Sequence, residues 1–232
     1  YEKLYDCDVA GLTVKTYQWL LDYIIIKMMK KTNPNLKVLI GGFRTSAQAS
    51  EFMKVIKDVD YAIWGEGEYP MLDFLRFLEG EKKEDEVPNL VYRHGSGLKS
   101  TYEINRKNLP LIDLYPFADH SDYFNTLNNM KLEGFSPVIP IWGSRSCYWH
   151  RCKFCILTES YPFRERSPKN IIQEMEYQSE KHNIYRFTFM DSNVAGSSKG
   201  RLKKLLKLIF ESSSKRKKPY QLFGEMSPLH ID

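Results

Sequence analysis

Three of the four cysteines, Cys147, Cys152 and Cys155, fall within nine residues of the chain. Clustered thiols indicate a metal or cluster site, because cysteines serve more often through their reactivity than through their size. Structural zinc takes four protein ligands, whereas an iron–sulfur cube held by three thiolates leaves one iron open to a substrate or cofactor. The spacing therefore predicts a metal centre at these cysteines, with an iron–sulfur cluster as the first hypothesis.

The same segment supports an alternative of a different class, a zinc-binding interaction module. His150 lies between the first two cysteines and would close a tetrahedral site that organises a docking surface beside a basic helix. Under the cluster hypothesis His150 is a residue of the loop and not a ligand. Anaerobic reconstitution with iron and sulfide separates the two, because a cluster gives a brown protein and zinc a colourless one.

The composition is that of an ordinary globular chain. Of the 232 residues 42% are hydrophobic and 27% are charged, and the net charge is +5, with basic residues gathered at Lys203, Lys204, Lys207 and 215–218. No aromatic residues alternate with these charges in the sequence, which favours a solvated helix face over a nucleic-acid surface. Clustered cysteines are typical of a reducing cytoplasm, and no apolar run of the sequence approaches the roughly 20 residues of a membrane span. We therefore expect a cytoplasmic protein that binds neither membrane nor nucleic acid.

The amino-terminal part alternates between strand and helix patterns. Strands are predicted at 8–14, 36–40 and 61–64, helices at 16–31, 47–57 and 71–78, and a hairpin at 89–103. This alternation is typical of a parallel α/β sheet with right-handed crossovers. The chain opens at Tyr1 without a methionine and enters a predicted buried strand at once, from which we expect a fragment of a longer protein.

Two glycine-rich turns follow predicted strands of this sheet. Gly41 and Gly42 end the second strand, and Gly65, Glu66 and Gly67 follow the third. Ligands of open α/β sheets lie beyond the carboxyl ends of the strands, where glycine lets the backbone approach them closely. Either turn alone is explained by the positive φ of a tight turn, but two on one edge favour a nucleotide-like or flat-ring ligand. The sequence has no Gly-x-Gly-x-x-Gly pattern to support nicotinamide or flavin.

The carboxyl-terminal part repeats the alternation. Residues 104–136 carry prolines and weak periodicity and are predicted as a linker with a helical turn within 119–130. Strands follow at 138–142, 186–190 and 220–223, and helices at 168–182 and 199–213, the first capped by Ser167. Because barrel sites lie at the carboxyl ends of strands and the cysteines follow the first strand, we favour a barrel cut short.

With Phe154 before the last cysteine, the thiol segment resembles the cluster loop of radical S-adenosylmethionine enzymes. The family's usual pattern is C-x3-C-x2-C, whereas this chain has C-x4-C-x2-C. The subclass with an amino-terminal cobalamin-binding domain is resembled, in order, by segments 8–13, 37–42, 60–68, 109–113 and 143–147. The Asp-x-His-x-x-Gly cobalt-ligand motif is absent from the sequence, so base-off ligation is not supported.

This resemblance implies a fold in two parts. A Rossmann-like, cobalamin-binding-type parallel sheet would cover residues 1–103, with its first strands missing, and a linker would follow over 104–136. The first half of a (βα)6 partial TIM barrel, truncated at its carboxyl end, would cover 137–232.

The resemblance also implies the chemistry. Cys147, Cys152 and Cys155 would hold a 4Fe-4S cluster whose open iron chelates S-adenosylmethionine (SAM). An electron from a flavodoxin- or ferredoxin-type donor would cleave SAM to a 5′-deoxyadenosyl radical, which takes a hydrogen from the substrate. Methylcobalamin held at the two glycine turns would then methylate a small-molecule or peptide substrate. A radical SAM enzyme without cobalamin, its first part a scaffold, is the second alternative.

Three polar residues are implied as contacts of SAM. Asp191 and Asn193 follow the second barrel strand, and Glu225 follows the third. Asp-Ser-Asn before a glycine is also an ordinary turn and helix cap, so the structural interpretation stays open beside the functional one.

Other residues receive structural roles. Arg164 and Arg166 are expected on a solvated loop, and Cys7 is expected as a small core residue. The segment 161–168 resembles the corresponding loop of radical enzymes that modify ribosomally made peptides.

Overall fold

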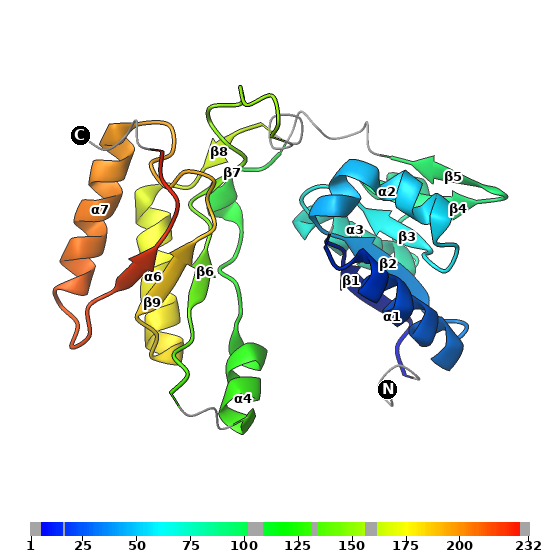
Figure 1. Cartoon of the computed structure of the whole chain (residues 1–232), viewed down its shortest axis with the longest axis horizontal. Helices are drawn as coiled ribbons and strands as arrows, with labels where there is room; N and C mark the ends of the chain where they lie inside the picture. Colours follow the sequence, from blue (N-terminus) through cyan, green and yellow to red (C-terminus); the bar gives the residue numbers. More distant parts are fainter. Residues whose placement is uncertain (1–5, 16, 102–108, 131–133, 156–161, 228–232) are drawn as a thin grey trace. The chain divides into compact units, whose positions relative to one another are not determined.

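The computed structural model describes residues 6–15, 17–101, 109–130, 134–155 and 162–227, and of 43–47 the backbone alone. The chain divides into two compact units, Tyr1–Leu109 and Pro110–Asp232, each with its own parallel strands (Figure 1). The mixed α/β class with parallel sheets is confirmed. The domain boundaries expected from the sequence stay a prediction.

A five-stranded sheet forms the centre of the first unit, in the order β1-β2-β3-β4-β5. Three strands run parallel, namely β1 (Val9–Thr13), β2 (Lys37–Gly41) and β3 (Tyr61–Ile63). A hairpin of β4 (Leu90–His94) and β5 (Gly97–Ser100) adds two antiparallel strands beside β3. The alternation therefore predicted both the parallel strands and the hairpin correctly.

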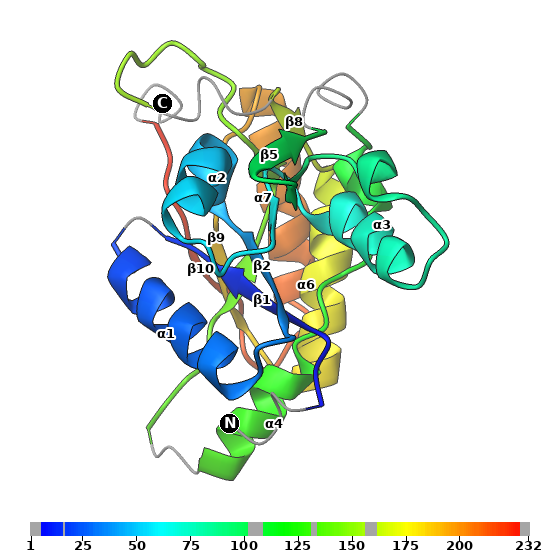
Figure 2. The same ribbon diagram turned by 90° about the vertical axis from the view of Figure 1, so that its right-hand side faces the viewer.

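Helices cover both faces of this sheet. α1 (Trp19–Thr32) and α2 (Phe43–Val55) lie on one face, and α3 (Glu68–Leu78) lies on the other (Figures 1 and 2). Side chains along β2 alternate between the two faces of the sheet, so this strand contributes to the packing on both. Leu39 packs in one cluster with Phe74 of α3, and its neighbours on the strand face the opposite side. A short 3-10 turn, η2 (Glu84–Glu86), precedes the hairpin.

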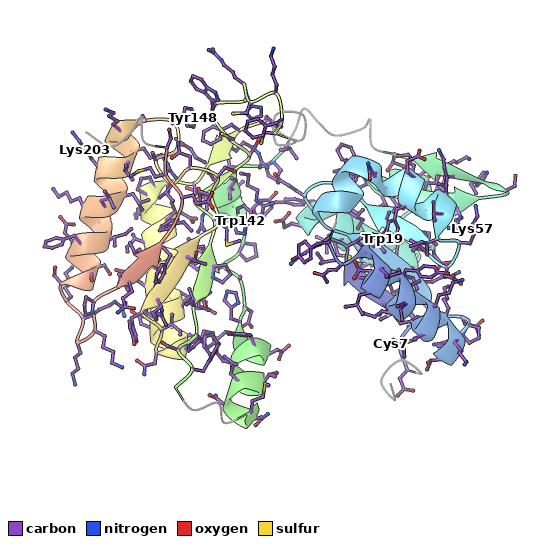
Figure 3. The ribbon with its side chains drawn as sticks, viewed as in Figure 1. Cys7, Trp19, Lys57, Trp142, Tyr148 and Lys203 are labelled. Carbon is purple, nitrogen blue, oxygen red and sulfur yellow. The ribbon has the colours of Figure 1, made fainter. Side chains whose placement is uncertain are left out.

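Three expectations for this unit are wrong. α2 begins at Phe43, not at Ala47, because Gly42 with φ of 98° turns the chain directly from β2 into the helix, which is kinked at Gln48. β1 is not a buried strand, since it lies at the edge of the sheet among the described residues and its side chains are half-buried or exposed. Cys7 is exposed because it precedes this edge strand, as Figure 3 shows.

The second unit is built on three parallel strands, in the order β10-β9-β6. The elements are β6 (Ile139–Ile141), α6 (Pro168–His182), β9 (Arg186–Phe189), α7 (Lys199–Ser213) and β10 (Gln221–Phe223). Both helices pack over one face of the sheet, where alternate strand residues join a single hydrophobic core (Figures 1 and 2). Ser167 caps α6 as predicted, because its Oγ accepts a hydrogen bond of 3.1 Å from the backbone N–H of Asn170.

The segment before β6 packs against α6. It contains a 3-10 turn, η4 (Ile112–Leu114), and α4 (Ser121–Met130), which confirms the predicted helical turn. The Ala118 carbonyl accepts a 2.7 Å hydrogen bond from Gln178, and the Phe124 ring stacks on His182 with centroids 4.3 Å apart. These contacts place the segment with the second unit.

Among the described residues no helix is both long and apolar enough to cross a membrane. Lys203, Lys204 and Lys207 of α7 are exposed, and Lys203 points away from the sheet in Figure 3. These three lysines lie on a solvated helix face, as expected from the sequence, whereas the basic residues 215–218 follow the end of α7 at Ser213.

Candidate functional site

A cavity of about 450 Å³ lies at the carboxyl ends of the parallel strands of the first unit. Its lining is glycine-rich and otherwise mostly apolar, and consists of Gly11, Leu12, Thr13, Leu39, Ile40, Gly41, Gly42, Ile63, Gly65, Gly67 and Met71. Four of the five residues predicted from the two glycine turns therefore line one cavity. The fifth, Glu66, is buried and is not part of the lining.

Gly42 is the glycine that the backbone requires. Its φ is 98°, and a Cβ built on it would come within 2.8 Å of Thr13 Cγ2 and 3.2 Å of the Val14 carbonyl oxygen. The chain can therefore pass β1 closely at this point only without a side chain. Gly11 and Gly67 differ, because a Cβ on either would meet no other atom within 4 Å. At these two positions the absence of a side chain leaves open space.

The three clustered cysteines lie in a loop that leaves the carboxyl end of β6. Two short strands, β7 (Ser144–Arg145) and β8 (Arg164–Glu165), pair antiparallel and join the two ends of this loop. We call residues 143–166, which contain β7 and β8, the cysteine loop; of these the structure describes 143–155 and 162–166. Its cysteines are thiols and are partly exposed, and Figure 3 labels Tyr148 within it and Trp142 directly after β6. The structure thus places the predicted metal ligands at the expected edge of the sheet.

The thiols are not gathered around a common point. In the described part of the chain, no group of three His, Cys, Asp or Glu side chains is placed to hold a metal ion. A turn connects two of the cysteines, since the Cys155 N–H donates a hydrogen bond to the Cys152 carbonyl at 3.0 Å. His150 has φ of 47° and its Nε2 lies 2.9 Å from Ser146 Oγ. The ligand assignments from the sequence stay a prediction.

Asp191 follows β9 and is only 4% exposed. One carboxylate oxygen accepts a 2.8 Å hydrogen bond from the Gly143 N–H, and the other accepts a 2.5 Å bond from Ser144 Oγ. Burial raises the pKa of Asp191, and the two hydrogen bonds oppose this shift. Asp191 therefore holds the start of the cysteine loop.

Asn193 lies two residues further on and is 5% exposed. Its Oδ1 accepts from the backbone N–H of Ala195 at 3.2 Å and of Ser227 at 3.4 Å. Its amide Nδ2 is buried, and among the described residues no acceptor is within hydrogen-bond reach. Glu225 is exposed, and its backbone carbonyl accepts from the Val194 N–H at 2.9 Å. Asn193 is thus the residue of this group that has a donor to offer.

Arg166 is a correction to the sequence analysis. It is buried, not solvated, because its guanidinium pairs with the buried carboxylate of Glu174 on α6 and donates to the Trp142 carbonyl at 2.9 Å. Arg164 is half-buried and donates to the Pro110 carbonyl at 2.7 Å. Of the segment 161–168, Tyr161 lies outside the described residues. The sequence analysis did not identify Arg201, because in the sequence it is one of several basic residues in α7.

The raised pKa of Asp191 makes stability depend on pH. The folded chain binds this proton more tightly than the unfolded chain, so the contribution is fully present below the ordinary pKa of 3.8 and is lost as pH rises through the folded value. Asp191→Asn cannot ionise. We expect the free energy of unfolding of the wild type to fall relative to this variant as pH rises across the mildly acidic range. Denaturant titrations at several pH values measure it, and a pH-independent or opposite difference would contradict it.

No protein-family model matches the chain. An uncharacterized methyltransferase of Pyrococcus horikoshii is 23% identical over 199 residues, which cover 85% of this chain and 42% of that protein. The cobalamin-dependent radical SAM enzyme OxsB, solved with aqua-cobalamin and SAM bound, matches with a TM-score of 0.72 at 18% identity, over 95% of this chain and 31% of OxsB. The radical SAM methyltransferase TsrM of Kitasatospora setae gives 0.65 at 14% identity, over 93% and 42%.

The chain has the fold of cobalamin-dependent radical SAM enzymes. The resemblance inferred from its motifs is confirmed, at low identity in sequence and over nearly the whole chain in structure. The chain spans less than half the length of each of these three proteins.

Proposed function

We propose that this chain acts as a cobalamin-dependent radical SAM enzyme, with methyl transfer as its reaction. The observation that carries the proposal is the position of three partly exposed thiols on one loop at the carboxyl end of a parallel strand. The fold is shared with OxsB and TsrM, and TsrM is solved with cobalamin and a 4Fe-4S cluster bound.

The residue types of the cysteine loop fit a 4Fe-4S cluster. Three thiolates are the donor set that leaves one iron open, and partial exposure of Cys147, Cys152 and Cys155 makes them reachable. A zinc site would need His150 as the fourth ligand, and one ring nitrogen of His150 already faces Ser146. The described residues do not gather three such side chains around a metal, so we propose the cysteines as ligands from their type and spacing.

When bound, such a cluster supplies the electron that cleaves SAM and generates the radical. The chain's own part is to hold the two cofactors. The cavity of the first unit suits the flat face of a corrin, because its described lining is mostly glycine and apolar residues, with Thr13, and includes no charged side chain. The names of the Pyrococcus protein and of TsrM, both methyltransferases, support methyl transfer. We propose a small-molecule or peptide substrate and a flavodoxin- or ferredoxin-type electron donor.

Asn193 supplies a donor to SAM under this proposal. Its buried Nδ2 needs an acceptor, and the carboxylate or ribose oxygens of SAM are acceptors, whereas its amino group is not. Asn193→Asp keeps the oxygen that Ala195 and Ser227 use but removes the donor. Because a hydrogen bond to a charged group contributes about 1.5–3 kcal/mol, we expect SAM to bind roughly 10- to 100-fold more weakly.

Equilibrium binding of SAM to the reconstituted chain measures this effect. Asn128→Asp, the same change at an exposed position of α4, is the matched control and should bind SAM as the wild type does. Equal affinities of Asn193→Asp and wild type for SAM would show that the Asn193 Nδ2 does not donate to SAM.

Anaerobic reconstitution with iron and sulfide tests the proposed function. We expect a brown chain that converts SAM to 5′-deoxyadenosine when dithionite supplies electrons. A colourless chain with stoichiometric zinc would support the interaction-module alternative instead. Titration with hydroxocobalamin separates the remaining alternative, because a chain that cleaves SAM but binds no cobalamin is a radical SAM enzyme whose first unit is a scaffold.

A further inference from the structure

The Gly143 peptide, at the start of the cysteine loop, is held from both sides. Its N–H donates to the Asp191 carboxylate at 2.8 Å. Its carbonyl accepts from Arg201 Nη2 at 2.8 Å and from the Arg166 N–H at 2.9 Å. A Cβ at Gly143 would lie 3.0 Å from Asp191 Oδ1, so the carboxylate sits directly against this backbone. The backbone of Gly143 is thus linked to Asp191, which follows β9, and to Arg201, which lies in α7.

Arg201 lies in the first turn of α7, and its side chain is only 7% exposed. Besides Gly143, its guanidinium donates to the Arg166 carbonyl at 3.0 Å and to the Val194 carbonyl at 3.5 Å. Glu165, on β8, is its ion-pair partner at 3.4 Å. A single side chain therefore ties together the start of the cysteine loop, its end, and the connection after β9.

The backbone after β9 is shaped around this ion pair. Gly196 has φ of 66°, and a Cβ there would come within 2.6 Å of both Arg201 Nη1 and Glu165 Oε2. Glu165 also accepts hydrogen bonds from the Ser197 N–H at 3.0 Å and from Ser197 Oγ at 2.7 Å. Both partners of the pair are fixed from several directions, which is the arrangement expected of a rigid support.

We propose that Arg201 is a positioning residue for the cysteine loop, and that Asp191 acts with it from the opposite side of the Gly143 peptide. This inference rests on the proposed function and adds how the thiols are presented to the cluster. The planar guanidinium offers five donors in a fixed fork, which is why one residue can serve three carbonyls and a carboxylate. Asp191 then supports the loop, because both its oxygens accept hydrogen bonds from Gly143 and Ser144, and its role as a contact of SAM stays a prediction.

Two conservative variants test the proposal. Arg201→Lys keeps the charge but loses the fork, and Ser144→Ala removes one hydroxyl that bonds to Asp191. Because groups that orient metal ligands typically matter 10- to 100-fold for affinity, we expect about tenfold weaker iron uptake in both variants and a larger loss in Arg201→Met. Lys203→Met, on the exposed face of the same helix, is the matched control and should load iron as the wild type does.

Spectroscopy distinguishes positioning from a general loss of stability. The electron paramagnetic resonance signal of the reduced cluster should broaden in Arg201→Lys and respond less to SAM, while circular dichroism and the melting temperature stay near those of the wild type. Unchanged iron uptake and spectra in Arg201→Lys and Ser144→Ala would overturn the inference. A wild-type chain that takes up no cluster would instead overturn the proposed function on which it rests.

Discussion

Replacing Cys152 by alanine is expected to abolish cluster uptake and SAM cleavage, whereas replacing Cys7 by alanine leaves both unchanged. Three thiolates are the minimum that holds the cube with one open iron, so a single loss leaves too few ligands. Cys7 is exposed before β1 in the first unit and serves as the control for a lost thiol. Iron and sulfide analysis after anaerobic reconstitution, followed by detection of 5′-deoxyadenosine, measures the two effects.

The same outcome is expected for Cys147 and Cys155, because each supplies one of the three sulfur atoms. His150→Ala separates the cluster from zinc. Under the cluster proposal this variant loads iron normally, since His150 only meets Ser146 within the loop. Loss of metal in His150→Ala, with full retention in any one cysteine variant, would contradict the assignment of the ligands.

Filling the cavity of the first unit is expected to weaken cobalamin binding. Gly11 lines the cavity, and a Cβ added to it would meet no other atom within 4 Å. We therefore expect the side chain of Gly11→Leu to extend into ligand space. Because forcing extra methylenes into a filled site costs about 1–3 kcal/mol, hydroxocobalamin should bind roughly 5- to 140-fold more weakly.

Gly97→Leu is the matched control for that experiment. It adds the same side chain to a strand of the same sheet, at an exposed hairpin position outside the cavity lining. The control should bind hydroxocobalamin with wild-type affinity, measured by spectral titration, and both variants should melt near the wild-type temperature. Unaltered binding by Gly11→Leu would show that the ligand lies elsewhere.

Local patterns were sufficient for most of the fold. The alternation of strands and helices predicted the parallel sheets, and the pair Ser167 and Pro168 marked the start of α6 correctly. Strands as short as β7 and β8 carry no periodicity, because two residues cannot show an alternation. The start of α2 was missed because its cause is the turn geometry of Gly42, which the sequence does not encode as a helix pattern.

The site residues also include some that the sequence identified and some that it missed. Thiols and glycines were identified from the sequence because their chemistry depends on residue type and spacing. Arg166 and Arg201 were not, because their roles depend on burial and on carbonyls that the fold brings from distant segments. Cys7 was predicted in the core but is exposed, because a cysteine next to an edge strand is buried only when another element covers that edge.

The electron paramagnetic resonance spectrum of the reduced, reconstituted chain, recorded before and after addition of SAM, is the most direct measurement. An iron left open by Cys147, Cys152 and Cys155 would take the amino and carboxylate groups of SAM as ligands, so we expect the g values to shift. A cluster signal that SAM leaves unaltered would contradict an open iron, and with it radical chemistry at this loop.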